Sequence, residues 1–437
     1  YVCIRVDARG AGCSPGLLDP WSMREARDIF DCIEWAAIQT WSSGKIGMNG
    51  ISYYAMNQWH AAGLEPPHLA ACCIWEGSSD FYREQIRHGG IYSQFSENLY
   101  PRAFHRAQHG LGERGHKSRA TGELISGPDN LSDEELAANR IDIERWGLDR
   151  DLISDDFVER SAQFVKVTVP LLSAANWGGQ GLHTRGNFEG YLAAASDRKW
   201  LEAHGDAHWT HFYTDYDVAL QKRFFGHFLK GEDTGWDKRP SVQLNIRHPV
   251  ETFVLRAENE WPLARTQWTR YYLDPAEMSF TPFEASHGEP VAYEALGDGL
   301  LFKTPPLEAP LEITGPSAAK LTLSSETTDA DVFLVLRVFD PAGKEVTFIG
   351  ANDPRTPVAQ GWLRASHRNL DPGKSLPYRP YHTHDEPQPL EPGEPVDLDI
   401  EIWPTCIVVP EGYVLALHLR GCDYAGDGGA LALPGVK

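Results

Sequence analysis

Ser52 is the residue of this sequence whose surroundings best suit a chemical role. Residues 44–50 before it form a short segment predicted to be a strand, and residues 54–63 after it are predicted to form a helix. A sharp turn between a strand and a helix holds a serine hydroxyl above the carboxyl edge of a parallel sheet, where it can attack a carbonyl carbon. The simpler interpretation is a serine that caps the helix in an ordinary turn. We favour the nucleophile, because the flanking sequence alternates strands with helices.

The residues after Ser52 differ from the usual pattern of such a turn. Tyr54 and then Ala55 follow in the place where a glycine is common. Gly50 leaves room on the other side of the turn, so we still expect the turn to form.

A serine hydroxyl is a weak nucleophile until a base takes its proton. The base is expected after the last strand of the sheet, which is predicted at residues 199–204 and followed by Gly205-Asp206-Ala207-His208-Trp209. We predict His208 as the base. His204 and His211 are the alternatives, but His204 is expected at the strand end and His211 at the start of the final helix.

The third member of a catalytic triad holds the imidazole in the correct tautomer and stabilises its charged form. Its usual place is the turn after the penultimate strand, which here is Asn176-Trp177-Gly178-Gly179-Gln180 and contains no carboxylate. Glu76 and Asp80 follow the preceding strand, and either could be a relocated acid. The simpler interpretation makes Glu76 structural and Asp80 the cap of the next helix. The sequence leaves the acid open between Glu76, Asp80 and none.

The negative oxygen of a tetrahedral intermediate needs hydrogen-bond donors. The backbone N–H of Tyr53, directly after the nucleophile, is predicted to be one of them. A second donor cannot be assigned from the residues.

Strands and helices alternate through the first 240 residues, apart from a polar insertion. This alternation predicts a mostly parallel sheet covered by helices on both faces. The insertion is rich in Arg, His and Glu, and a capping box at Ser132-Asp133-Glu134-Glu135 predicts a helix within it. The predicted strands are 1–7, 44–50, 69–75, 165–175 and 199–204. One predicted helix carries its apolar side chains at Ala26, Ile29, Phe30, Ile33 and Ala37. The other predicted helices are 54–63, 186–195 and 214–230.

Beyond Pro240 the helical periodicity ends. Residues 396–402 alternate apolar and acidic side chains, which is typical of a strand with one solvated face. Further strands are predicted at 331–339 and 413–420, so this part is expected to be a β-sandwich or jelly roll. We therefore expect an α/β domain from residues 1–79 and 161–240, a helical cap at 80–160, and an all-β domain at 241–437.

The composition excludes several classes of function. The net charge of the 437 residues is −21, which would repel nucleic acids and anionic membranes. Seven cysteines without a CxxC pair predict neither a disulfide framework nor a metal site, and favour a cytoplasmic location. No cofactor is expected, and the oligomeric state stays open, a homo-oligomer included.

Several segments together resemble the cocaine-esterase-like hydrolases, a group related to the X-Pro dipeptidyl peptidases and the α-amino-acid ester hydrolases. The resemblance implies an α/β-hydrolase domain, a helical cap and a C-terminal jelly roll. It also implies hydrolysis of small esters, amides or short peptides through an acyl-enzyme. An X-Pro dipeptidyl peptidase or a non-catalytic binding module of the same fold is the alternative. The segments are Asp7–Gly10, Trp41–Met48, Gly50–Tyr53, Pro66–Leu69 and Trp75–Arg83.

The sequence also departs from the family pattern. Gly179 stands where the family places the aspartate of the triad. Family members have further strands and an oxyanion-hole tyrosine upstream of the position of Tyr1, and their jelly roll continues beyond Gly435-Val436-Lys437. We therefore expect a chain that is shortened at both ends.

Overall fold

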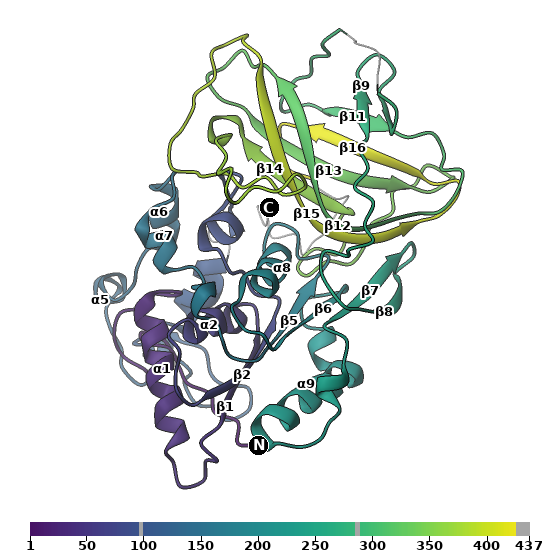
Figure 1. Cartoon of the computed structure of the whole chain (residues 1–437). Coiled ribbons are helices and arrows are strands. Elements are labelled where there is room, and N and C mark those ends of the chain that lie inside the picture. Colours follow the sequence, from purple (N-terminus) through teal and green to yellow (C-terminus); the bar gives the residue numbers. More distant parts are fainter. Residues whose placement is uncertain (96–98, 285–288, 425–437) are drawn as a thin grey trace.

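Two β-sheets, one above the other, make up the framework of the computed structural model (Figure 1). The structure describes residues 1–95, 99–284 and 289–424. Residues 435–437, where the sequence predicts an early end of the second domain, lie outside this part. The first sheet has six strands and the second has eight.

The secondary-structure elements have the following bounds. The helices are α1 (Met23–Ala37), α2 (Tyr53–Ala62), α4 (His105–Ala107), α5 (Asp133–Ala138), α6 (Ile143–Leu148), α7 (Asp155–Glu159), α8 (Thr184–Ala193) and α9 (Asp215–Phe225), with short helical turns that include η1 (Phe81–Ile86), η2 (Tyr100–Phe104) and η6 (Gly226–Lys230). The strands are β1 (Ile46–Ile51), β2 (Leu69–Trp75), β3 (Arg87–His88), β4 (Ile91–Tyr92), β5 (Leu171–Asn176), β6 (Lys199–His204), β7 (Val242–His248), β8 (Thr252–Glu258), β9 (Tyr272–Asp274), β10 (Ser279–Thr281), β11 (Leu300–Lys303), β12 (Leu311–Leu323), β13 (Asp331–Phe339), β14 (Ala359–Arg364), β15 (Val396–Val409) and β16 (Val414–Arg420).

The first sheet has the order β1-β2-β5-β6-β7-β8. Its strands are parallel up to β7, and β8 is antiparallel to β7. Alternate residues of β2 point to opposite faces: Cys72 and Ile74 pack with α1 and α2, whereas Ala71, Cys73 and Trp75 pack with α9. Helices thus cover both faces, as the sequence predicts.

Short helices form the insertion between β2 and β5 (Figure 1). α5 begins with the predicted capping box: Ser132 Oγ accepts from the N–H of Glu135, and the Glu135 carboxylate accepts from the N–H of Ser132. Phe81, Ile143 and Phe157 are buried together in the core of this region.

The second sheet has the order β12-β15-β14-β13-β16-β11-β10-β9 and is antiparallel except for the pair β10–β11. Its inner face packs against a large apolar core that includes Leu334, Leu398 and Ile400. Residues 396–402 alternate in burial as predicted. A mostly parallel sheet and a separate, mostly antiparallel C-terminal domain confirm the predicted fold class.

Three segments differ from the prediction. The strand expected at 165–175 begins only at Leu171, because Phe164–Lys166 form a helical turn. Residues 1–7 pair with no strand in the described part of the chain, and their side chains are largely exposed; Tyr1 instead lies under the ammonium of Lys230. An apolar segment becomes a strand only when a neighbour takes up its backbone hydrogen bonds, and no described strand does so here. β7 and β8, which follow residue 240, extend the first sheet instead of the second.

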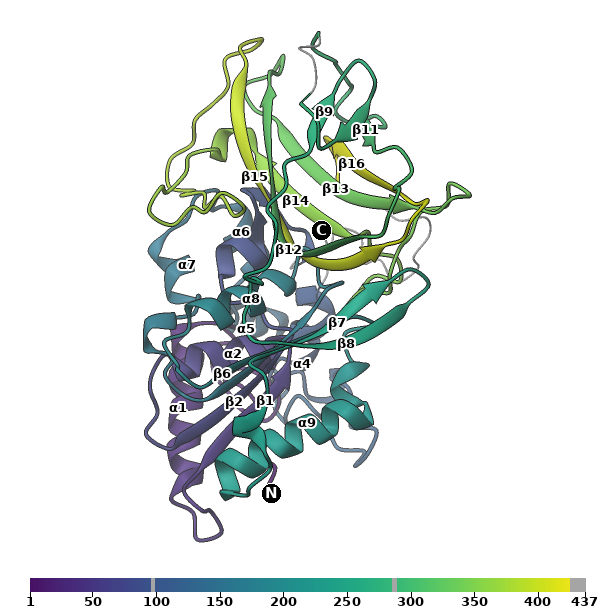
Figure 2. The same cartoon turned by 45° about the vertical axis from the view of Figure 1, so that its right-hand side comes forward.

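Helix α8 lies between the two sheets (Figure 2). Phe188 and Tyr191 pack on the first sheet, while Arg185 forms an ion pair with Glu401 of β15. The start of α8 therefore lies at the carboxyl end of β5, beside the ends of β2 and β6, where the candidate site is found.

Candidate active site

Ser52 lies between β1 and α2 in a conformation that L-residues rarely adopt. Its φ is 60° and its ψ is −117°, and its backbone N–H donates to the carbonyls of Trp75 and Glu76 at 3.0 and 3.1 Å. Such strain persists only where the surroundings enforce it, and it is concentrated at functional sites. The side chain makes no capping hydrogen bond to the helix, which removes the simpler interpretation of Ser52 as a cap.

Glycines make the sharp turn at Ser52 sterically feasible. A Cβ atom on Gly50 would lie 2.4 Å from the Cβ of Tyr54, and one on Gly77 would lie 2.6 Å from the Cβ of Ala55. The large residue at 54 is accommodated because its side chain points into solvent, where it is 68% exposed. Gly50 supplies the room that the sequence assigned to it.

Glu76 and His208 form a buried pair next to Ser52. The Glu76 carboxylate lies 2.6 Å from Nδ1 of His208, and both side chains are almost inaccessible to solvent. Glu76 is the first residue after β2, and His208 is in the loop after β6. The backbone N–H of His208 donates to the carbonyl of Ala351 at 2.9 Å, so a loop of the C-terminal domain fixes the position of this histidine.

Glu76 also binds a second histidine, His204, at 3.0 Å. The other ring nitrogen of His204 lies 2.6 Å from Glu202, so this imidazole is enclosed by two carboxylates. Burial opposes the charge, but Glu202 and Glu76 outweigh it and raise the pKa of His204 to about 10. Burial likewise opposes ionisation of Glu76, yet His208 and His204 hold the pKa of its carboxyl well below its usual range. Glu76 is therefore an ionised acceptor for the Nδ1–H of His208.

Asp80, the other candidate acid, does not contact His208. Its carboxylate accepts from the backbone N–H of Arg83 at 2.9 Å and pairs with the Arg83 guanidinium at 2.8 Å. This arrangement caps η1, as the simpler interpretation of the sequence holds. His211 is likewise engaged elsewhere, because its Nδ1 lies 2.9 Å from Asp217 at the start of α9.

His183 is a residue of the site that the sequence analysis did not identify. Its Nε2 lies 2.9 Å from Oγ of Ser52 and its ring stacks on His208 with centroids 5.3 Å apart. A sequence signal existed, because His183 lies in the loop after β5, at the edge of the sheet where Ser52 and His208 are also placed. From the sequence, a carboxylate and not a histidine is expected in that loop.

Tyr53 directly follows the nucleophile candidate and is the first residue of α2. Its N–H therefore has no acceptor within the helix. Its phenol donates a hydrogen bond to Glu25 of α1, and burial raises the pKa of that carboxyl to about 7. The contact anchors the side chain of the residue that follows Ser52.

The turn after β5, where the usual acid would stand, is closely packed. A Cβ atom on Gly178 would lie 2.4 Å from the Cα of Gly350, and one on Gly179 would lie 3.0 Å from Oγ1 of Thr184. The C-terminal domain thus packs directly on this turn. The carboxylate that contacts His208 comes instead from Glu76, directly after β2.

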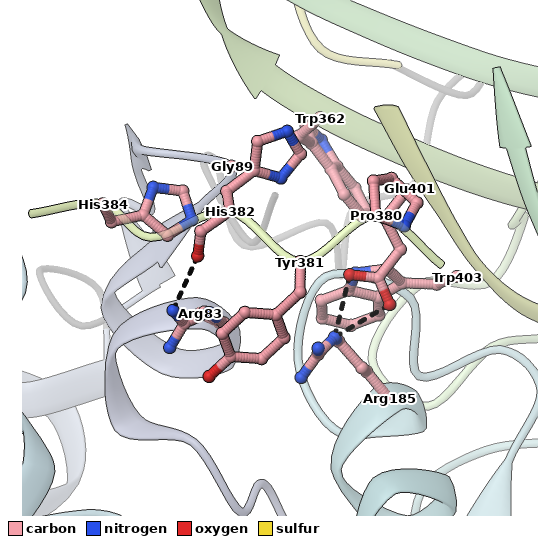
Figure 3. Close-up of a pocket in the computed structure, with 10 residues that line it drawn as sticks. All are labelled: Arg83, Gly89, Arg185, Trp362, Pro380, Tyr381, His382, His384, Glu401 and Trp403. Carbon is pink, nitrogen blue, oxygen red and sulfur yellow. Dashed lines mark hydrogen bonds and ion pairs between the residues drawn. The ribbon is translucent and has the colours of Figure 1, made fainter. Parts of the chain in front are cut away.

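A pocket between the second sheet and the helices η1 and α8 is lined by charged and aromatic side chains (Figure 3). Arg185 contacts Glu84 at 2.8 Å and Glu401 at 3.0 Å, and the guanidinium of Arg83 lies 4.3 Å from the ring centre of Tyr381. The positive charges in this pocket are matched by carboxylates. We infer that it fastens the C-terminal domain to the rest of the chain.

The described residues offer neither a metal site nor a membrane span. No group of three or more His, Cys, Asp or Glu side chains there could hold a metal ion. Within the same residues, every helix is too short or too polar to cross a lipid bilayer.

Two family models match the chain in succession. The model of the X-Pro dipeptidyl-peptidase (S15 family) matches residues 1–213. The model of the X-Pro dipeptidyl-peptidase C-terminal non-catalytic domain matches residues 234–426. The first match contains Ser52, Glu76, His183 and His208, and the second contains the C-terminal β-domain.

Individual proteins show the same relationship. A solved CocE/NonD family hydrolase from Staphylococcus aureus is 32% identical, with a TM-score of 0.87, and the match covers 97% of this chain and 73% of that one. A Mycobacterium bovis protein named as a serine esterase is 25% identical over 97% of this chain and 78% of its own length. The cocaine esterase of a Rhodococcus species is 23% identical over 97% of this chain and 81% of its own length.

Proposed function

The chain belongs to the CocE/NonD family and is a serine hydrolase that acts on ester or amide bonds, and we propose from this premise that Ser52, His208 and Glu76 are its catalytic triad. The observation that carries the proposal is the buried contact of 2.6 Å between Glu76 and Nδ1 of His208, next to a strained serine. The triad acid then comes from the end of β2 instead of the turn after β5.

The first half of the reaction acylates Ser52. Ser52 Oγ attacks the carbonyl carbon while Nε2 of His208 takes the hydroxyl proton. Glu76 keeps the proton of His208 on Nδ1 and stabilises the imidazolium that forms. The backbone N–H of Tyr53 donates to the negative oxygen of the tetrahedral intermediate. His208 then gives its proton to the leaving alcohol or amine.

The second half releases the acid. A water molecule loses a proton to His208 and attacks the acyl carbon, and the bond between that carbon and Ser52 Oγ breaks. His208 returns the proton to Oγ, so no cofactor is consumed.

We propose small esters, amides or short peptides with a compact acyl group as substrates. The helical insertion at 81–159 covers the side of Ser52 where Trp21, Phe81 and Phe104 form an aromatic cluster with Tyr53. An X-Pro dipeptidyl peptidase is the second candidate, favoured by the family model that matches residues 1–213.

A fluorophosphonate probe tests the triad. We expect the purified chain to be labelled and Ser52→Ala to be unlabelled. His208→Ala should slow labelling and ester turnover by about three orders of magnitude or more. His116→Ala, an exposed histidine of the insertion, is the matched control and should behave as wild type. Labelling that survives Ser52→Ala would reject Ser52 as the nucleophile.

Two chromogenic substrates distinguish the candidates for the reaction. A p-nitrophenyl ester of a short acid should be hydrolysed if the chain is an esterase. An Ala-Pro p-nitroanilide should be preferred, by kcat/KM relative to the uncatalysed rates, if it is an X-Pro peptidase. We expect the ester to be preferred.

A further inference from the structure

His183 lies next to Ser52, in the place where the base of a catalytic triad usually stands. Its Nε2 lies 2.9 Å from Ser52 Oγ, whereas the carboxylate of Glu76 binds His208. We propose that His183 is a second histidine of the site, which donates a hydrogen bond to Ser52 Oγ and so directs the hydroxyl proton toward His208. This inference rests on the proposed triad.

The tautomer of His183 follows from its contact with Ser78. The backbone N–H of Ser78 points at Nδ1 of His183 at 3.2 Å. A backbone N–H can only donate, so Nδ1 must be an acceptor and carries no proton. A neutral imidazole with a bare Nδ1 has its proton on Nε2. The hydrogen bond to Ser52 therefore runs from the Nε2–H of His183 to Oγ.

The same reasoning gives His208 the opposite tautomer. Because Glu76 is ionised, Nδ1 of His208 carries the proton that the carboxylate accepts. Its Nε2 is then bare and can take a proton. The two stacked rings thus have complementary roles: His183 presents a donor, and His208 presents an acceptor.

His183 is poorly suited to act as the base itself. Its Nε2 already holds a proton in this tautomer, and Nδ1 already accepts from the N–H of Ser78. The side chain is 1% exposed, and burial, followed by the charge of His208, holds its pKa well below the usual range of histidine. His183 therefore stays neutral while His208 gains and loses the proton.

The surroundings of His183 keep its ring in place. Its backbone N–H donates to Gly179 at 3.0 Å, directly before α8 begins. The hydroxyl of Ser78 lies 3.0 Å from Nδ1 and 2.7 Å from the carbonyl of Leu182. A donor fixed in this way occupies one lone pair of Ser52 Oγ and restricts the rotation of the hydroxyl.

Two substitutions of His183 separate the effect of its N–H donor from the effect of its ring. Gln at position 183 can place an N–H close to the position of Nε2, whereas Phe keeps the flat ring and removes the donor. We expect His183→Phe to lower the second-order rate of fluorophosphonate labelling and kcat of ester hydrolysis by about 10²-fold, with little change in KM. His183→Gln should recover most of this loss. The pH at which activity falls on the acid side should be the same in His183→Gln and wild type, because His208 still takes the proton.

A tautomer measurement on the intact wild-type chain gives a readout that does not depend on a variant with altered folding. Imidazole ¹⁵N spectra, with His183 assigned by its absence in His183→Gln, should show a proton on Nε2 and a bare Nδ1 from pH 6 to 9. A proton on Nδ1 of His183 would overturn the proposal.

The kinetic outcomes also distinguish this inference from the triad. If wild type is labelled and His183→Phe is labelled equally fast, the role of His183 is rejected and the triad stands. If His183→Gln loses as much as His208→Ala and its acid-side fall in activity disappears, His183 is the base and the proposal is wrong. If wild type is not labelled at all, the triad itself fails.

Discussion

Glu76 accepts hydrogen bonds from two histidines that carry protons for different reasons. His204 lies between Glu202 and Glu76 and is charged because these carboxylates raise its pKa to about 10. His208 has Glu76 as its carboxylate partner, through Nδ1, and its ring stacks on that of His183. Glu76 thus contacts the proposed base and also a second imidazole, His204, which helps to keep its carboxyl ionised.

Replacement of the acid tests this arrangement. Glu76→Gln would turn an amide toward Nδ1 of His208 and favour the tautomer whose Nε2 cannot accept the serine proton. We expect kcat/KM for ester hydrolysis to fall by about 10³- to 10⁴-fold, as for removal of a triad acid. Steady-state kinetics and the labelling rate measure the effect.

Asp80→Asn is the matched control for Glu76→Gln. The Asp80 carboxylate pairs with Arg83 and caps η1, so Asp80→Asn should be less stable than wild type. At temperatures below its melting temperature, its labelling rate should stay within about threefold of the wild-type rate. A loss of 10³-fold in Asp80→Asn, with Glu76→Gln unaffected, would exchange the two assignments.

At the scale of the element, the turn between β1 and α2 depends on one glycine. A Cβ at position 50 would overlap the Cβ of Tyr54, and both atoms belong to a turn that Ser52 already strains. We expect Gly50→Ala to destabilise the chain by roughly 1–3 kcal/mol and to reduce labelling of Ser52 strongly. Thermal unfolding and the labelling rate measure both effects.

A second substitution tests whether the clash with Tyr54 causes the effect of Gly50→Ala. If overlap with Tyr54 causes the loss, the double variant Gly50→Ala, Tyr54→Gly should label faster than Gly50→Ala alone. No recovery in the double variant would mean that the backbone conformation of Gly50, and not the contact with Tyr54, is required.

The sequence predicts elements better than it predicts their contacts. α1, β2, β6 and α9 begin and end within a few residues of the predicted positions, because local periodicity and caps define them. Residues 1–7 have the same apolar character but form no strand, since strand formation also depends on a partner in the sheet. The pairing of β7 with β6 likewise depends on tertiary contacts, which local sequence patterns do not encode.

The candidate site shows the same limit at the level of side chains. Position along the chain is enough to nominate Ser52 and His208, because loops after parallel strands meet at one edge. It leaves Glu76 and Asp80 equivalent, since the choice depends on which carboxylate reaches across 132 residues to His208. His183 could be noticed by its place after β5, but its tautomer depends on the N–H of Ser78, which only the folded chain brings there.

At the scale of the whole molecule, the C-terminal domain helps to build the site as well as enclosing it. The carbonyl of Ala351 accepts from the N–H of His208, and the N–H of Ala351 donates to Gly178. The C-terminal domain therefore fixes the loop that carries the proposed base. A detached first half would lose this support.

Arg185 is the main buried ionic link between the parts. It joins Glu84 at the start of the helical insertion and Glu401 on β15 from its place in α8, and its own side chain is almost inaccessible. Arg185→Met keeps the volume but leaves two carboxylates buried without their cation. We expect a loss of about 3–5 kcal/mol in the free energy of unfolding at pH 8, measured by chemical denaturation.

The pH dependence of this loss identifies its cause. Burial already raises the pKa of Glu84 to about 7, and removal of Arg185 should raise it further. A carboxyl whose folded pKa exceeds its unfolded value stabilises the fold at low pH and loses that contribution as pH rises through the folded pKa. Arg185→Met should therefore be less destabilised at pH 6 than at pH 8. Arg9→Met, which breaks an exposed pair with Asp28 of α1, should leave the free energy of unfolding nearly unchanged. Equal losses in the two variants, or a loss in Arg185→Met that does not change with pH, would contradict a buried ionic link through Arg185.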